Sequence, residues 1–350
     1  MKTIWKIILV LLLLLVGFFL KTFWQAGGFK TITNEFKGEI QKVYVPGVED
    51  ITIDQETGVA FLSSYDRWKD LIHKSPEKGG IYALHLEDSM PHPIHLTPDF
   101  PKTEFHPHGI SLYISPEGKR ILYVINHQSD QDAIEIFEYY NDTLEHKASI
   151  TDPLIISPND IVGVGERSFY MTNDHNERAS TSRSIKDLAQ IGTGNIVYYD
   201  GEKANATGIE DVTYANGINV SLDGKTLYMS SPSDNTIYTY DRNIETGTLT
   251  YKSEFFTNTG VDNIELDTEG NLWVGCHPQL LKFLSHAGDS TAHSPSEVIK
   301  LTPKDNSFEQ ATIYINDGSE LSASATGAVY KDNLLIGPVF SRHFLWCKME

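Results

Sequence analysis

A short polar phrase followed by isoleucine recurs five times along the chain. The phrases are Glu49-Asp50-Ile51, His108-Gly109-Ile110, Asn159-Asp160-Ile161, Asn216-Gly217-Ile218 and Asp262-Asn263-Ile264. Apart from the imidazole of His108, their polar side chains all offer carboxylate or amide oxygens. Any one phrase is an ordinary turn former. Their recurrence at the same phase of successive units indicates that they share a site.

Oxygen-donating side chains of this kind suit a hard cation of high coordination number, which means calcium, whereas magnesium would take fewer protein ligands and more water. We expect one calcium ion among Glu49, Asn159, Asn216, Asp262 and Asn263. Because this set supplies only two negative charges, the ion would keep the Lewis acidity needed to polarise a carbonyl and hold an oxyanion. The adjacent Asp50 and Asp160 alternate to the other side of their strands, which favours a second, structural calcium there.

Three histidines add proton chemistry to this set. A neutral imidazole at His108 is a natural general base for a water molecule near the ion. His127 ends the following strand, where strand pairing can bring the two rings into contact, and His277 holds the equivalent place in another unit. Because the chain has no Gly-x-Ser-x-Gly motif, attack by water is favoured over a covalent acyl-enzyme.

Each polar phrase opens a predicted pair of strands. Turn residues follow the isoleucine, as in Ser115-Pro-Glu-Gly118 and Asp267-Thr-Glu-Gly270, and a strand rich in Leu, Tyr and Val comes next. A third strand is expected at residues 81–84, 134–137, 195–198, 236–239 and 280–283. Residues 333–336 and 344–346 repeat the pairing near the C-terminus.

These six units, of roughly 45 to 60 residues each, predict an all-β protein, a six-bladed β-propeller. The first strand of each blade would line a central calcium-binding channel, where the polar phrases converge. A β-sandwich is the alternative, but it would not explain why one phrase opens successive units. Residues 31–45 are expected to pair with the C-terminal blade, since an open ring would expose strand edges.

The N-terminal segment has the features of a signal peptide or signal anchor. Lys2 and Lys6 precede the fourteen uncharged residues 7–20, and Phe23 and Trp24 follow as interfacial aromatics. Because a small-x-small cleavage site is hard to find, we favour retention as an anchor over cleavage. We therefore expect a hydrophobic anchor helix in residues 1–28 and the propeller in residues 29–350. The propeller would lie on the exported side of a membrane, anchored or secreted.

Composition excludes some classes of partner and site. A formal net charge of −19 argues against nucleic acid, because a phosphate backbone would be repelled. Only two cysteines occur, Cys276 and Cys347, so neither a disulfide framework nor a cysteine-based zinc site can be built.

From about residue 43 to the C-terminus, the chain resembles the paraoxonase family of arylesterases and lactonases. The phrases that carry the resemblance are Val48-Glu-Asp50, His106-Pro-His-Gly-Ile-Ser111, Val124-Ile-Asn-His127, Asn159-Asp-Ile-Val162, Thr172-Asn-Asp-His175, Ala215-Asn-Gly-Ile-Asn219, Val261-Asp-Asn-Ile264 and Trp273-Val-Gly-Cys-His-Pro278. So many phrases in one order would not arise from chance similarity between propellers.

The resemblance implies a hydrolase of lactones and aryl esters, and promiscuously of phosphotriesters. It implies two Ca²⁺ ions: a catalytic ion on the five residues given above, and a structural ion on Asp50, Asp160 and the carbonyl of Ile110. His108 and His127 match the proposed dyad of the family, and His277 matches an auxiliary residue. Trp68 and Tyr214 fall where the family has pocket aromatics, which would favour small lipophilic substrates, and the retained N-terminus is similar to a lipid anchor.

One departure from the family concerns its disulfide. Animal members join a cysteine before the first blade to one near the C-terminus, and Cys347 matches only the latter. We therefore expect ring closure by strand pairing alone. Two alternatives remain at this point: a non-catalytic propeller in which calcium is only a structural pin, and a gluconolactonase-like sugar lactonase.

Overall fold

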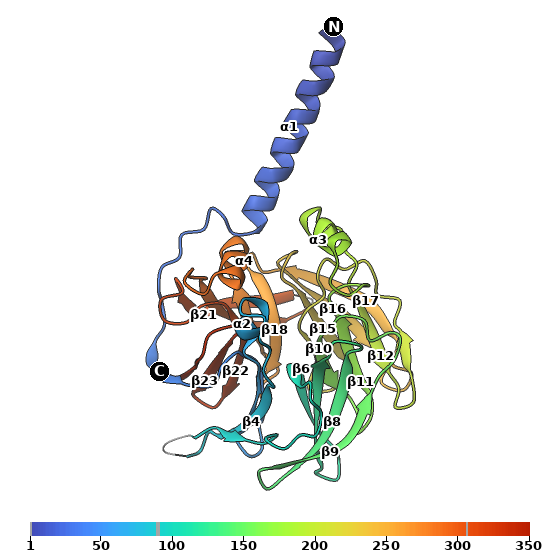
Figure 1. Cartoon of the computed structure of the whole chain (residues 1–350), viewed down its shortest axis with the longest axis vertical. Helices are drawn as coiled ribbons and strands as arrows, with labels where there is room; N and C mark the ends of the chain where they lie inside the picture. Colours follow the sequence, from blue (N-terminus) through green and yellow to red (C-terminus); the bar gives the residue numbers. More distant parts are fainter. Residues whose placement is uncertain (1, 89–91, 306) are drawn as a thin grey trace.

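The strands of this computed structural model form a β-propeller from which one long helix projects (Figure 1). The structure describes residues 2–88, 92–305 and 307–350, so Met1 of the expected anchor lies outside it. Within these ranges the strands form six sheets, each of four antiparallel strands. The predicted six-bladed, all-β propeller is therefore confirmed.

The first three blades follow one another along the chain, and each runs from its innermost to its outermost strand. Blade 1 contains β2 (Val48–Asp54), β3 (Val59–Ser64), β4 (Gly80–His85) and β5 (Ile94–His95). Blade 2 contains β6 (His106–Ile114), β7 (Arg120–His127), β8 (Ala133–Tyr140) and β9 (Thr143–Ile150). Blade 3 contains β10 (Pro158–Gly163), β11 (Phe169–Asn173), β12 (Asn195–Tyr199) and β13 (Ala204–Ala206).

The remaining blades complete the ring. Blade 4 contains β14 (Ile218–Val220), β15 (Thr226–Ser231), β16 (Thr236–Arg242) and β17 (Leu249–Phe256). Blade 5 contains β18 (Gly260–Leu266), β19 (Leu272–His277), β20 (Ser296–Lys304) and β21 (Ser307–Asn316). Blade 6 contains β22 (Ser324–Tyr330), β23 (Asn333–Pro338) and β24 (Phe344–Met349), and β1 (Gly38–Val43) is its outermost strand.

Ring closure joins the two ends of the propeller sequence. β1 pairs antiparallel with β24, from Gly38 opposite Met349 to Val43 opposite Phe344. This pairing confirms the expectation that residues 31–45 supply the closing strand. Both cysteines are free and buried, so strand pairing closes the ring without a disulfide.

Apolar side chains pack between neighbouring blades and fix them against one another. Phe61 of blade 1 meets Tyr139 of blade 2 edge-on, with ring centroids 4.8 Å apart. Tyr123 of blade 2 meets Phe169 of blade 3 at 5.6 Å. Burial of one such side chain contributes about 1.5–3 kcal/mol. These contacts make the inner strands a firm frame for whatever lines the channel.

Three helices lie at the end of the propeller from which α1 projects, and none of them was predicted (Figure 1). They are α2 (Arg67–Leu71), α3 (Thr181–Leu188) and α4 (Leu280–Gly288). The strand expected at residues 280–283 was wrong, because this segment belongs to α4 and β20 is the third strand of blade 5. A short apolar run fits both periods, and here Leu280, Phe283 and Ala287 recur at helical spacing.

The projecting helix, α1 (Lys2–Gln25), confirms the apolar helix expected at the N-terminus. Within its residues 3–25, an 18-residue stretch has a mean hydropathy of 2.7, and none of that stretch is buried. At 1.5 Å per residue these residues span about 35 Å, enough to cross a hydrocarbon core of about 30 Å. The base of the helix is fixed to the propeller: Leu280 N–H donates to the carbonyl of Ala26, and Trp24 stacks on Phe256.

Candidate functional site

Bulges at the beginning of the innermost strands set the geometry of the channel. The pairing register shifts between Val48 and Asp50, Pro107 and Ile110, Pro158 and Ile161, and Val261 and Ile264. A bulge leaves a residue unpaired and re-aims its side chain. The polar phrases of blades 1, 2, 3 and 5 lie in these bulges, and in blade 4 Asn216 precedes the short strand β14.

Five of the predicted ligands, here called the amide-rich set, are Glu49, Asn159, Asn216, Asp262 and Asn263, and each is at most 5% exposed. Four of their oxygens, from four blades, have no hydrogen-bond partner among the described residues: Oε2 of Glu49 and Oδ1 of Asn159, Asn216 and Asn263. One unsatisfied buried acceptor costs about 1–3 kcal/mol. A cation with oxygen ligands would remove that cost, so the donor set fits calcium.

The fit of this donor set to calcium depends on the amide oxygens of its asparagines. The Nδ2 group of Asn263 donates to Oε1 of Glu49 at 3.1 Å, which links blade 5 to blade 1 and leaves Oδ1 of Asn263 free to coordinate. No cluster of three or more His, Cys, Asp and Glu side chains in the described ranges has the arrangement of a metal site. A calcium site here therefore depends on asparagine as much as on carboxylate.

The predicted structural ligands Asp50 and Asp160, here called the aspartate pair, have different surroundings. Each accepts a backbone N–H from the next residue in its own strand, at 2.8 Å. Each also accepts one from a neighbouring blade at 2.7 Å, Asp50 from Ile110 and Asp160 from Ile218. Ile110 thus contacts Asp50 through its backbone N–H. The sequence analysis had proposed its carbonyl as a ligand of the structural ion.

Negative charge accumulates around the aspartate pair. Burial and then the charge of Glu49 raise the pKa of Asp50 well above its ordinary value, and burial and the charge of Asp50 do the same for Asp160. Glu265, which was not predicted, shows the same effect of burial and Asp50 on its pKa. Glu265 could have been predicted from its spacing, because it follows Asn263 by two residues and side chains at that spacing in a strand share a face. A cation would offset this repulsion.

His108 and His127 form one hydrogen-bonded unit, as their strand positions suggested. His108 Nδ1 lies 2.8 Å from His127 Nε2. His127 Nδ1 lies 3.3 Å from Oδ1 of the buried Asp132, a residue that the sequence analysis missed although it is only five positions from His127. Desolvation lowers the pKa of His127, although 36% of its side chain remains exposed. The result is a relay of Asp132, His127 and His108.

Glu49 joins this relay to the amide-rich set. Its Oε2 lies 3.4 Å from His108 Nε2 and 3.8 Å from Arg67, which the sequence analysis also missed. Burial raises the pKa of Glu49, but the nearby His108 and the charge of Arg67 outweigh it and lower the pKa to about 2. Glu49 is therefore a carboxylate, the form that a cation requires.

His277 occupies the equivalent strand end in blade 5. Its Nε2 lies 2.8 Å from Oδ2 of Asp262, and its ring packs against Phe283 with centroids 4.1 Å apart. Burial raises the pKa of Asp262, while the hydrogen bond from His277 opposes that rise. His277 thus orients a predicted ligand and is not part of the His108 relay.

The predicted pocket aromatics lie in two different clusters. Trp68 in α2 stacks on Phe340 at 5.6 Å, with an angle of 14° between the ring planes. Tyr214, in the loop before β14, meets His175 edge-on at 5.3 Å and has a φ of 60°. They therefore do not form one stack.

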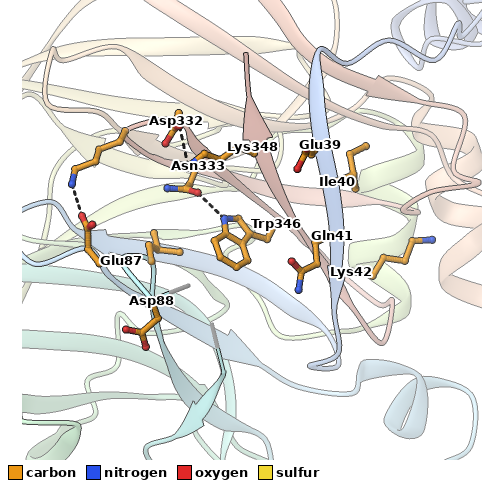
Figure 2. Close-up of a pocket in the computed structure, with 12 residues that line it drawn as sticks. Glu39, Ile40, Gln41, Lys42, Glu87, Asp88, Asp332, Asn333, Trp346 and Lys348 are labelled. Carbon is orange, nitrogen blue, oxygen red and sulfur yellow. Dashed lines mark hydrogen bonds and ion pairs between the residues drawn. The ribbon is translucent and has the colours of Figure 1, made fainter. Parts of the chain in front are cut away.

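A surface cavity of about 910 Å³ lies at the seam between blades 6 and 1 (Figure 2). Figure 2 shows Trp346 donating to Asn333, beside side chains of both charges such as Glu87 and Lys348. None of the predicted site residues lines this cavity. The concentration of orphaned oxygens and histidines makes the channel the candidate active site instead.

Comparisons with known proteins identify relatives over most of the chain. A sequence model of the family described as Arylesterase matches residues 31–349. Human serum paraoxonase/arylesterase 1 is 33% identical over 328 residues, which cover 89% of this chain and 91% of the relative. Rat serum paraoxonase/arylesterase 2 is 32% identical over 313 residues, which cover 87% and 86%. The agreement extends over nearly the whole propeller.

A solved structure agrees with the fold. A luciferin-regenerating enzyme matches with a TM-score of 0.54 at 14% identity, covering 89% of this chain and 97% of that one. Similarity at this level of identity supports the propeller architecture alone.

Proposed function

The chain belongs to the arylesterase family, and on that premise we propose that it is a calcium-dependent hydrolase that opens lactones and cleaves aryl esters. The observation that carries the proposal is the group of four orphaned oxygens beside the hydrogen-bonded pair of His108 and His127. Phosphotriesters with good leaving groups are a further class of substrate for the same site.

We assign two calcium sites to the channel. The amide-rich set would hold the catalytic ion, and the aspartate pair, with the carbonyl of Ile110, would hold the structural ion. Calcium held by the amide-rich set would supply positive charge to polarise a substrate carbonyl and to stabilise the oxyanion. Glu49 and Asp262 would supply the only two carboxylates of this set, and its three asparagine oxygens would add no further negative charge.

The histidine relay determines which nitrogen can accept a proton. The carboxylate of Asp132 accepts from His127 Nδ1–H, which leaves a lone pair on His127 Nε2. That lone pair accepts from His108 Nδ1–H, so the basic nitrogen of His108 is Nε2, on the side of Glu49. Water that attacks the carbonyl gives its proton to His108 Nε2. His277 keeps Asp262 oriented as a ligand.

The substrate is expected to be small and lipophilic. Trp68 and Tyr214 provide apolar ring surface for acyl chains or aryl groups. The helix α1, within the proposed anchor segment 1–28, would hold the hydrolase domain 29–350 at a membrane or lipid surface on the exported side. A protease-protection assay on membrane vesicles, with an antibody against the C-terminus, tests that orientation.

An activity panel tests the proposed chemistry. The purified chain is assayed on alkyl lactones, sugar lactones and aryl esters, in calcium and after chelation, with circular dichroism to follow the fold. We expect hydrolysis of alkyl lactones and aryl esters that depends on calcium. Absence of turnover with calcium bound would indicate a calcium-pinned binding module, and preference for sugar lactones would indicate a sugar lactonase.

A further inference from the structure

Two polar ring atoms have no hydrogen-bond partner within an aromatic cluster to which the proposed mechanism assigns only apolar contacts. They are Nε1 of Trp68 in α2 and Nε2 of His286 in α4, and no partner for either exists among the described residues. The two rings meet edge to face, with centroids 5.0 Å apart. Phe340 packs against both rings, and His286 is only 2% exposed.

The two atoms have opposite hydrogen-bonding roles. His286 Nδ1 lies 2.5 Å from the carbonyl oxygen of Ala292, and a carbonyl can only accept, so Nδ1 carries the proton. A neutral imidazole protonated at Nδ1 has a lone pair at Nε2. Burial lowers the pKa of His286, which favours this neutral form. Trp68 Nε1–H is only a donor, so the cluster offers one donor and one acceptor.

Only some chemical groups satisfy both atoms. A hydroxyl accepts one hydrogen bond and donates another, so its chemistry matches both the donor of Trp68 and the acceptor of His286. A carbonyl or carboxylate leaves His286 Nε2 unpaired, an ammonium leaves Trp68 unpaired, and a methyl group leaves both unpaired. In apolar surroundings each unpaired polar atom is costly. The pair is therefore selective for a hydroxyl group.

The cluster borders the proposed active site. Phe283 lies between His277, at 4.1 Å, and Phe340, at 6.0 Å. Ala325, which occupies the bulge of β22 where the other blades have polar residues, belongs to the same apolar cluster. Ring contacts thus join His277, which is bonded to the predicted ligand Asp262, to the Trp68 and His286 pair.

We propose that Trp68 and His286 bind a hydroxyl group on the acyl side chain of the substrate, so that hydroxylated lactones are favoured over otherwise identical lactones. This inference rests on the proposed hydrolase function, which it deepens by naming a substrate class. Trp68 and His286 are specificity residues, because they recognise the substrate away from the reacting carbonyl.

Binding of lactams, which keep the ring but resist hydrolysis, tests the subsite without requiring turnover. The full chain with calcium is titrated by calorimetry with alkyl lactams that carry one hydroxyl at successive side-chain carbons, or none. We expect one hydroxylated isomer to bind about tenfold more tightly than the plain lactam. Trp68→Phe and His286→Phe each keep a ring but remove one hydrogen bond to the ligand hydroxyl, so each should reduce that preference by about 3- to 10-fold. His286→Phe also removes the bond from Nδ1 to the carbonyl of Ala292. The ratio of kcat/KM for the matching lactones should change in parallel.

Trp346→Phe is the matched control, because it also removes an indole N–H, one that is bonded to Asn333 in blade 6. Its hydroxyl preference should equal that of the wild type. A wild-type chain that hydrolyses plain lactones but shows no hydroxyl preference overturns the subsite, with buried water as the partner of both atoms, and leaves the proposed function intact. A preference that survives in both variants also overturns it. Hydroxyl-selective binding without any hydrolysis would support the subsite and reject the proposed function.

Discussion

The amide-rich set and the aspartate pair both lie at the inner strands, yet their oxygens differ in whether they accept hydrogen bonds from the chain. In the aspartate pair, backbone N–H groups reach both oxygens of each carboxylate at 2.7–2.8 Å. In the amide-rich set, four oxygens have no donor within the described residues. Backbone donors therefore satisfy the carboxylate oxygens of the aspartate pair. The four oxygens of the amide-rich set need a partner from outside the chain.

This difference separates two roles that calcium can have in one channel. An ion at the aspartate pair would chiefly offset the repulsion among Asp50, Asp160 and Glu265, which is an effect on stability. An ion at the amide-rich set would satisfy oxygens that lie beside the basic nitrogen of His108, which is an effect on catalysis. Perturbing each group separately should thus give different phenotypes.

Calcium removal should have the largest effect, because it perturbs both groups together. We expect chelation to abolish hydrolysis and to lower the melting temperature, since ligands from several blades lose their common ion. Activity and thermal unfolding are measured in calcium, after chelation and after calcium is restored. Full activity in a sample shown by metal analysis to lack calcium would contradict the metal assignment.

Substitution at the relay should affect catalysis without affecting metal binding. His108→Gln should lower the turnover of an alkyl lactone by about 10²- to 10⁴-fold, because glutamine cannot accept the proton. His127→Gln should have a smaller effect, and calcium affinity should change little in either variant. Activated aryl esters should lose less activity than alkyl lactones. A near wild-type rate of lactone opening by His108→Gln would remove this residue from the mechanism.

Single substitutions in the two groups test the division directly. At equal folded fraction, Asn216→Ala should cost about tenfold more activity than Asp50→Ala, equivalent to about 1.4 kcal/mol of transition-state stabilisation. The reason is that Asn216 contributes an oxygen to the catalytic ion, whereas Asp50 supports the frame. Steady-state kinetics and chemical denaturation are compared for both variants. Equal losses of activity would mean that the two groups act as one site.

Glu135 provides a carboxylate outside the channel, and its effect should be the smallest. Burial raises its pKa, but hydrogen bonds from Lys102, Ser149 and Asn126 outweigh that and lower the pKa below the ordinary 4.5. Its contribution to stability is therefore complete above about pH 4.5 and is lost as pH falls through the lowered pKa. We expect Glu135→Gln to cost about 1–3 kcal/mol at pH 7, and the loss should be the same with and without calcium. Urea unfolding across pH 3–7 measures this change in the free energy of unfolding. A change that depends on calcium would mean that Glu135 is coupled to the calcium sites of the channel.

The sequence was most informative where a local pattern repeats. Polar phrases, turns and paired strands recur, so the six blades, the closing strand and the convergence of the phrases could be predicted. Helices α2, α3 and α4 interrupt the pattern as single insertions, and the run at residues 280–283 fits a strand as well as a helix.

Parts of the candidate site depend on contacts that no local pattern reveals. Arg67 reaches Glu49 only because α2 folds back over blade 1. His286 meets Trp68 across more than two hundred residues of sequence, through a helix that was not predicted. The ligand residues, His108 and His127 were proposed from their positions within the repeat, and their burial and hydrogen bonds add the geometry that position alone cannot give.

The pairing of β1 with β24 has a consequence for the synthesis of the chain. β1 leaves the ribosome early, while β24 follows it by about 300 residues, which takes about 15–60 s at ordinary rates of translation. One edge of β1 is the outer edge of its sheet in the finished fold, and during that interval the other edge, which will pair with β24, has no partner strand. Its exposed Glu39, Gln41 and Lys42 make that edge polar, which discourages pairing with other nascent chains. A transcript truncated within the last few codons would leave the edge open permanently and would favour aggregation of the product.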